Sequence, residues 1–103
     1  MELDEKFADR LAQLRTLKGV SARDMSLSLG QSTGYINNIE NKNNLPSMTA
    51  FFYICEYLNI TPKDFFDFDS VDPEKLNEII SDLKKLSFEQ LEHISNVIKD
   101  LTK

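Results

Sequence analysis

Apolar residues recur along this chain at intervals of three and four positions, which is the spacing of one face of an α-helix. The first such run contains Phe7, Leu11 and Leu14 and predicts a helix over residues 3–17. Runs of the same kind continue to the end of the chain, separated by capping residues, glycines and prolines. The pattern predicts an all-α protein of six or seven helices without strands.

The segment of residues 20–41 contains two such runs in close succession. Ser21 can cap the first helix, and Asp24 three residues later completes the pattern of a capping box. Gly30 can adopt the positive φ that ends this helix sharply, and Ser32 can cap the second. The apolar positions that the two helices turn toward a shared core are Met25, Leu29, Ile36 and Ile39. The segment therefore predicts two short helices joined by a glycine turn.

The second of these helices is polar on the side that faces away from the core. Its outward positions are Gln31, Thr33, Gly34, Asn37 and Asn38. A short helix that is held by its apolar side and presents amides and hydroxyls outward suits contact with base edges in a DNA major groove. A solvated helix face is the alternative interpretation of the same residues.

Capping signals divide the next part of the chain into two further helices. Ser47 follows a proline and can begin a helix that runs through Leu58, after which Asn59 can take the left-handed closing conformation. Thr61 can cap a short fifth helix, with Pro62 in its first turn. The apolar bulk of that helix, which we expect in the core, comes from Phe65, Phe66 and Phe68.

Residues 69–103 predict a hairpin of two amphipathic helices. The first begins at Asp72, before a proline, and the second begins at Ser87, with Gln90 in the capping-box position. The second helix repeats apolar residues at the spacing of a coiled-coil seam. The positions expected to form a dimer contact are Leu76, Ile80, Leu83, Leu91, Ile94, Ile98 and Leu101. The hairpin either folds back on its own domain or pairs with a second subunit, and the acidic linker before it favours pairing.

The composition is that of one globular domain with an appendage. The chain has 103 residues, of which 41% are hydrophobic, and this is enough for a folded core. The lone Cys55 has no partner for an internal disulfide, which favours a reducing compartment. The start of the sequence carries acids where a secretory signal needs cations, and Glu56 and Asn59 interrupt the most apolar segment. We therefore expect a cytoplasmic protein without a membrane span.

The net charge of −5 opposes DNA binding at long range, because phosphates repel an acidic protein. The charge is segregated along the chain, however. Residues 6–50 carry six cations and three acids, a balance of +3, whereas residues 69–103 carry five lysines and eight acids, a balance of −3. We expect the mildly basic part to face DNA and the acidic hairpin to face away from it, where a protein partner can bind.

A series of short motifs spans residues 7–66. In chain order they are Arg10-Leu11, Leu14-Arg15, Gly19-Val20-Ser21, Leu29-Gly30, Ile36, Ile39-Glu40-Asn41, Pro46-Ser47 and Leu58-Asn59-Ile60-Thr61-Pro62-Lys63-Asp64-Phe65-Phe66. Taken in this order, they resemble the Cro/CI-type (XRE-like) helix-turn-helix repressors of bacteria and phages. The resemblance implies a five-helix lambda-repressor-like DNA-binding domain over residues 1–68, followed by the C-terminal helical hairpin of residues 69–103.

The resemblance also implies roles for individual residues. Those that match the base-reading side of the family's recognition helix are Thr33, Gly34, Asn37 and Asn38. Those expected to contact phosphate are Gln31, Ser32, Arg23, Tyr35, Asn41, Lys42 and Asn43. Tyr35 can equally be a half-buried residue at the rim of that surface. Arg15 and Glu40 match a family ion pair that bridges the first helix to the third, which is a structural role.

Two parts of the chain depart from the family pattern. Ala22 stands where many relatives carry a glutamine that grips phosphate, and the adjacent Arg23 is the residue able to replace it. Lys42 stands where the family usually has a glycine, often at positive φ, and neutral amides follow where cations are common. Together these departures point to modest affinity for DNA.

The sequence favours a regulator over an enzyme. His93 is the only histidine and lies far from Cys55 along the chain, so no nucleophile with a base, metal-ligand cluster or phosphate-binding glycine loop is visible. We expect no catalysis, no cofactor and no metal. The favoured function is a sequence-specific transcriptional repressor that reads a palindromic operator in double-stranded DNA as a homodimer. The alternative is a protein-interaction module of the same fold, an antitoxin, anti-repressor or adaptor, with weak or no DNA binding.

Overall fold

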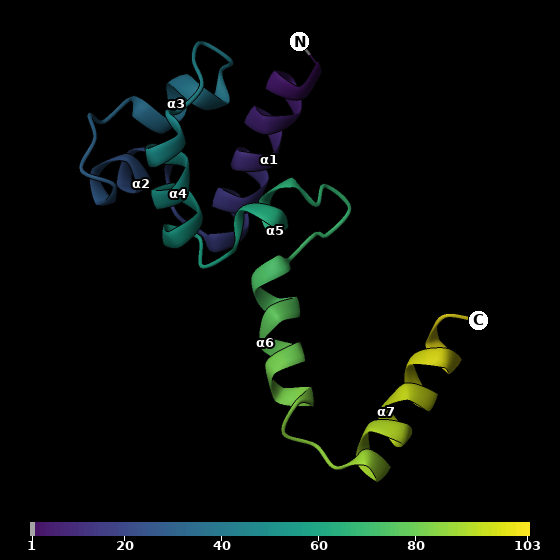
Figure 1. The fold of residues 1–103 in the computed structure, drawn as a ribbon. Helices are drawn as coiled ribbons and strands as arrows, with labels where there is room; N and C mark the ends of the chain where they lie inside the picture. The colour runs from purple at the N-terminus through teal and green to yellow at the C-terminus, as the bar shows by residue number, and fades with distance from the viewer. Residues whose placement is uncertain (1) are drawn as a thin grey trace.

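The computed structural model describes residues 2–103, which form seven α-helices and no strand (Figure 1). The helices are α1 (Glu2–Lys18), α2 (Ala22–Ser28), α3 (Tyr35–Glu40), α4 (Met48–Tyr57), α5 (Pro62–Phe66), α6 (Pro73–Leu83) and α7 (Phe88–Leu101). The prediction of an all-α fold is confirmed. Across residues 2–103, every helix falls short of the length and apolar character that a membrane crossing requires.

Helices α1 to α5 pack around one core. Its largest fully buried apolar side chains are Phe65, Leu11, Met25, Ile36, Ile39 and Ile54. The rings of Phe7, Phe51 and Phe65 join α1, α4 and α5, with ring centroids 4.8 to 5.6 Å apart. The apolar stripes read from the sequence therefore meet in one place, and the burial of their surface is the main favourable term in folding.

The predicted starts of α4 and α5 and the predicted closing residue after α4 are confirmed. Ser47 Oγ accepts a hydrogen bond from the backbone N–H of Ala50 at the start of α4. Thr61 and Asp64 form a full capping box at the start of α5. Between the two helices Asn59 has φ 57°, the left-handed conformation that asparagine tolerates better than most residues. Local capping chemistry thus sets where these helices begin and end.

Two predictions about the central helices are wrong. Helix α3 begins at Tyr35, later than expected, and its N-cap is Gly34, so Ser32 does not cap it. The chain before α3 instead forms a turn, in which the N–H of Tyr35 donates to the Ser32 carbonyl. The capping box of α2 is only half formed, because Ser21 accepts from the N–H of Asp24 at 3.0 Å while the Asp24 side chain is left in solvent.

Arg10 on α1 is buried, with 2% exposure, and its guanidinium joins α1 to the end of α5. It donates to the backbone carbonyls of Asp64 (2.8 Å), Phe65 (2.7 Å) and Ser70 (2.7 Å). Carbonyls at a helix C-terminus lack partners within the helix and carry its partial negative charge. Burial lowers the pKa of Arg10, and these acceptors compensate the desolvated cation. One of the six cations counted toward the DNA-facing charge is therefore not available to DNA.

Helix α6 leaves the domain through a defined joint. Asp72 caps it by accepting from the N–H of Lys75 at 3.0 Å, and Pro73 is buried. Asn77 donates its side-chain amide to Asp64 Oδ2 at 2.9 Å. Helix α7 then diverges from α6, so that the two helices form an open V that extends away from the five-helix domain (Figure 1). The overall extents of 51 × 27 × 22 Å reflect this arm.

The apolar faces of α6 and α7 are exposed. The exposed fractions are 49% for Leu76 and 41% for Ile80 on α6, and 39% for Leu91 and 38% for Ile94 on α7. Of the two arrangements left open by the sequence, the hairpin does not adopt the one in which it folds back on its own domain. Its two helices do not cover each other's apolar faces either.

The three phenylalanines expected in the core have different surroundings. Phe65 is fully buried, whereas Phe66 is 50% exposed and Phe68 is 37% exposed. Successive side chains of a helix point in different directions. Phe65 occupies the inward face of α5, whereas Phe66 lies at the edge of the core, with its ring centroid 5.4 Å from that of Phe51. The prediction that all three are core residues is therefore wrong.

The contact between α5 and α6 should have a measurable effect on the pKa of Asp64. The side-chain hydrogen bond from Asn77, followed by hydrogen bonds at Thr61, lowers the pKa of Asp64. The ionised Asp64 therefore stabilises the folded state. This contribution is fully present above the pKa of about 3.9 that Asp64 has in the unfolded chain, and it is lost as the pH falls through the lower pKa of the folded state. In the Asn77→Ala variant the pKa of Asp64 should rise toward its ordinary value, as measured by NMR titration of its carboxyl carbon.

The matched control is Asn96→Ala, at an exposed position of α7, which should leave the Asp64 titration unchanged. If Asp64 titrates alike in the Asn77→Ala variant and the unaltered chain, the joint does not form in solution.

Candidate nucleic-acid interface

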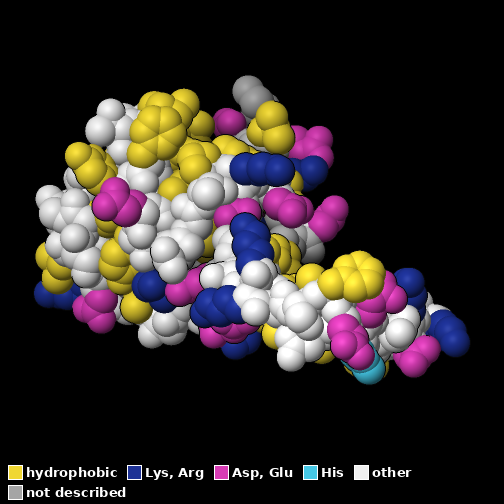
Figure 2. All heavy atoms as spheres, turned by 60° about the horizontal axis from the view of Figure 1, so that its bottom comes forward, with side chains coloured by type: hydrophobic (Ala, Val, Ile, Leu, Met, Phe, Trp, Pro, Cys, Tyr) yellow, Lys and Arg dark blue, Asp and Glu magenta, His cyan; other side chains and the backbone are white. Residues whose placement is uncertain are grey.

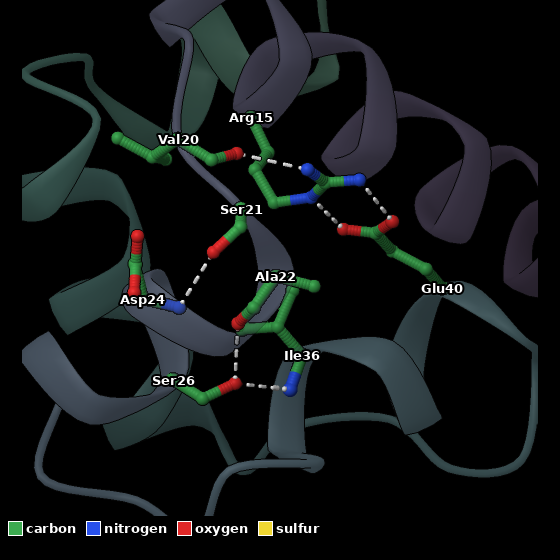
Figure 3. Close-up of polar contacts among 8 residues, drawn as sticks. All are labelled: Arg15, Val20, Ser21, Ala22, Asp24, Ser26, Ile36 and Glu40. Atoms are coloured by element: carbon green, nitrogen blue, oxygen red, sulfur yellow. Dashed lines mark hydrogen bonds and ion pairs between the residues drawn. The ribbon is translucent and has the colours of Figure 1, made fainter.

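A buried hydrogen bond fixes the start of α3 against α2 (Figure 3). Ser26 of α2 is fully buried, and its Oγ accepts from the N–H of Ile36 at 2.9 Å and donates to the Ala22 carbonyl at 2.7 Å. The first N–H groups of a helix have no partner within it, so Ser26 supplies one of the missing acceptors. Ile36 and Ile39 are completely buried beneath α3. The polar side of α3 is thereby held outward.

An ion pair fixes the other end of α3 to α1 (Figure 3). Arg15 donates to both carboxylate oxygens of Glu40, at 2.6 and 2.9 Å, and to the Val20 carbonyl at 2.9 Å. The side chain of Arg15 is 19% exposed and that of Glu40 is 11% exposed. The hydrogen bond to Glu40 raises the pKa of Arg15. A bidentate pair fixes orientation as well as distance, and because the two charges cancel, it adds no net charge to the surface.

Most candidate DNA-contacting residues before and on α3 are exposed. The exposed ones, which we call the α3 face, are Gln31, Ser32, Thr33, Asn37 and Asn38. Gly34 and Tyr35 are half-buried. Tyr35 packs against the core, and this burial raises the pKa of its hydroxyl, which favours its interpretation as a rim residue. Amides and hydroxyls therefore make up the α3 face.

The loop after α3 carries three more of the candidate residues, Asn41, Lys42 and Asn43, and all three are exposed. Lys42 has φ 65°, a left-handed conformation that glycine adopts without steric cost. This chain thus combines the backbone geometry expected of a glycine with a cation. The N–H of Asn43 donates to the carbonyl of Asn38 at 3.0 Å, which ties the loop to the α3 face.

Most cations of residues 6–50 already have partners. The ion pairs are Lys6–Glu2, Arg15–Glu40 and Lys42–Asp9. Lys18 lies over the ring of Tyr57, 5.4 Å from its centroid. Arg23 at the start of α2 is exposed and takes part in none of the ion pairs of residues 2–103. On the side drawn in Figure 2, cations and acids are intermixed rather than gathered in a basic patch.

The rest of the described chain offers little other chemistry. Within residues 2–103, histidine, cysteine, aspartate and glutamate side chains form no group of three that could hold a metal. Cys55 is buried, which raises the pKa of its thiol to about 11. A thiol of that pKa is protonated at neutral pH and is therefore a poor nucleophile. His93 is exposed on α7.

Two buried polar residues were absent from the sequence-based site: Ser26, which positions this surface, and Arg10, which holds the connector to α6. Ser26 lies on the apolar stripe of α2 with Met25 and Leu29, where a polar side chain must find a buried partner. Arg10 lies in the same way on the stripe of α1 that contains Leu14. A polar residue on an apolar stripe is thus the sequence signal that identifies both, although it does not identify their partners.

The sequence model of the helix-turn-helix family matches residues 11–65 of the chain. The match includes α2, α3, the α3 face and the loop that follows, and it ends before α6. No curated protein and no solved structure matches the chain.

The Ser26 hydrogen bond predicts a specific loss of stability. The Ser26→Ala variant leaves the N–H of Ile36 without its acceptor, which should lower the free energy of unfolding by about 1–3 kcal/mol. Urea denaturation measures this quantity. The control is Ser28→Ala on the exposed side of the same helix, which should change it by less than about 0.5 kcal/mol. Equal small effects of the two substitutions would show that Ser26 does not hold α3.

Proposed function

The chain belongs to the helix-turn-helix family of DNA-binding regulators, of the Cro/CI type, and we propose that it is a cytoplasmic transcriptional repressor that binds a palindromic operator as a homodimer. The observation that carries the proposal is the α3 face. A polar helix of six residues is held on one side by buried contacts and leaves amides and hydroxyls exposed on the other. Such a surface suits a major groove, where each base pair presents a distinct pattern of donors and acceptors.

Within this proposal, Thr33, Asn37 and Asn38 contact bases. Asparagine can form two hydrogen bonds with adenine, and threonine can contact the methyl group of thymine. Gly34 contributes no side chain, so its role is to let the backbone approach a base closely. Contacts to phosphate and sugar, which fix the register on the duplex, come from Gln31, Ser32, Arg23, Tyr35, Asn41, Lys42 and Asn43.

The proposed dimer forms through α6 and α7. Monomeric proteins rarely expose large contiguous apolar patches, so the exposed apolar faces of these helices favour a partner. The hydrogen bonds of Arg10 and Asn77 fix the direction in which α6 leaves the domain. A dimer contact on this arm would therefore also set the distance between two α3 faces. A two-fold dimer of this family type reads half-sites about 10 base pairs apart.

The pairing of cations favours a second candidate function. The pairing of Arg15 with Glu40 and the burial of Arg10 remove two of the six cations of residues 6–50 from contact with phosphate, and the net charge is −5. Non-specific affinity for DNA comes almost entirely from phosphate contacts. An antitoxin, anti-repressor or adaptor of the same fold needs no such contacts and would bind a protein partner at the acidic hairpin instead.

Selection of bound duplexes from a random pool distinguishes the two functions. With the full chain at low salt, the repressor proposal expects one enriched sequence with two-fold symmetry. The affinity for that duplex should fall steeply as salt rises, because each phosphate contact releases counterions. If no sequence is enriched at low salt, the proposal fails and the interaction module is favoured.

Substitutions at Asn38 and Arg23 should affect binding in different ways. Asn38→Ala should lose about 1–3 kcal/mol of discrimination at one base position of the selected duplex. Arg23→Ala should weaken binding to all duplexes and reduce the salt slope by about one. Competition binding with single-base variants of the duplex, at several salt concentrations, measures both effects.

The matched controls are Asn96→Ala and Lys63→Ala, at exposed positions on α7 and α5, and both should leave binding unchanged. Equal losses on every duplex for Asn38→Ala would show that Asn38 does not read a base.

A further inference from the structure

Lys42 has a backbone conformation that most side chains avoid. Its φ of 65° is left-handed, and among residues 2–103 the only other non-glycine residue with positive φ is Asn59. Asparagine visits this region routinely, whereas a lysine there brings its Cβ close to the following carbonyl oxygen. Strained residues of this kind cluster at functional sites. The strain at Lys42 therefore points to a role for its side chain.

The ammonium of Lys42 lies beside a carboxylate of α1. Its Nζ is 3.4 Å from Asp9 Oδ1, and the two side chains are 45% and 72% exposed. The pair of Arg15 and Glu40, by contrast, is largely buried. Little free energy holds an exposed ion pair closed. Lys42 can therefore exchange the carboxylate of Asp9 for another anion.

The backbone places this pair at the edge of the candidate DNA interface. Lys42 is the second residue after α3, and its N–H donates to the carbonyl of Ile39 at 3.0 Å. A duplex bound on the α3 face would bring phosphate close to Lys42 and also to Asp9. The carboxylate would then compete with phosphate for the same ammonium.

We propose that Asp9 sets the affinity for DNA by holding Lys42 in the free protein and competing with a phosphate for its ammonium. The inference rests on the proposed function, in which Lys42 contacts phosphate, and it adds a residue of α1 to the site. Phosphate contacts carry no sequence information directly, so Asp9 lowers the affinity for every duplex alike. The effect is electrostatic and becomes smaller as salt screens exposed charges.

The affinity of the full chain for the selected duplex tests this competition. At low salt, Asp9→Asn should tighten binding about two- to fivefold, and equally for single-base variants of the duplex. At high salt the gain should disappear. The matched control is Glu5→Gln, which removes an acid one turn earlier on the same exposed side of α1. Because Lys42 pairs with Asp9 and not with Glu5, the control should tighten binding less.

A double-variant cycle separates competition for Lys42 from general repulsion of DNA. Lys42→Ala removes the ammonium and should weaken binding to every duplex. In that background, Asp9→Asn should have no more effect than Glu5→Gln, because nothing is left to compete for. An equal gain from Asp9→Asn with and without Lys42 would show that Asp9 only repels phosphate, which overturns the inference. All three side chains are exposed, so the substitutions leave the core intact.

The outcomes distinguish this inference from the proposed function. If Asp9→Asn leaves the affinity unchanged while Lys42→Ala weakens it, the inference is overturned and the phosphate contact of Lys42 stands. If neither substitution changes the affinity for a selected duplex, the role of Lys42 is also wrong, although the chain still binds DNA. Only the absence of any selected duplex with the unaltered chain overturns the proposed function, and the inference then fails with it.

Discussion

A helix of six residues cannot hold its shape in water by itself, so the candidate DNA-reading surface depends on the contacts that fix α3. Ile36 and Ile39 are buried beneath it, Ser26 accepts a hydrogen bond at its start, and Glu40 pairs with Arg15 at its end. These contacts all engage the inner side of the helix. They hold it in place, while the amides and hydroxyls of the α3 face stay exposed.

The same structure uses its cations for positioning rather than for attraction. Arg15 orients α3, and Arg10 holds the connector to α6 at the end of α5. What remains on the α3 face is hydrogen-bonding capacity with little charge, which favours sequence preference over non-specific affinity. For such a protein, joining two reading surfaces in one dimer matters more, because the second half-site contact becomes intramolecular. In the proposed dimer, the exposed apolar side chains of α6 and α7 would make that connection.

The elements and most of their ends could be predicted because they depend on neighbours in the sequence. The capping box at Thr61 and the left-handed Asn59 are examples. The start of α3 could not be predicted, because its acceptor is a side chain of α2. The partners of Arg10 lie more than fifty positions away, beyond the reach of local pattern. The exposed polar residues of the candidate site could be predicted from the sequence. The contacts that hold α3 in place could be found only in the tertiary structure.

The measurement that tests the central claim most directly is an NMR titration of the full chain with the selected duplex, observing side-chain amides. The account predicts that the NH₂ signals of Asn37 and Asn38 shift strongly, because those groups enter the groove, while the signal of Asn96 on α7 stays in place. If the signals of α3 remain unchanged while those of α6 and α7 shift, the duplex binds elsewhere and the account is contradicted.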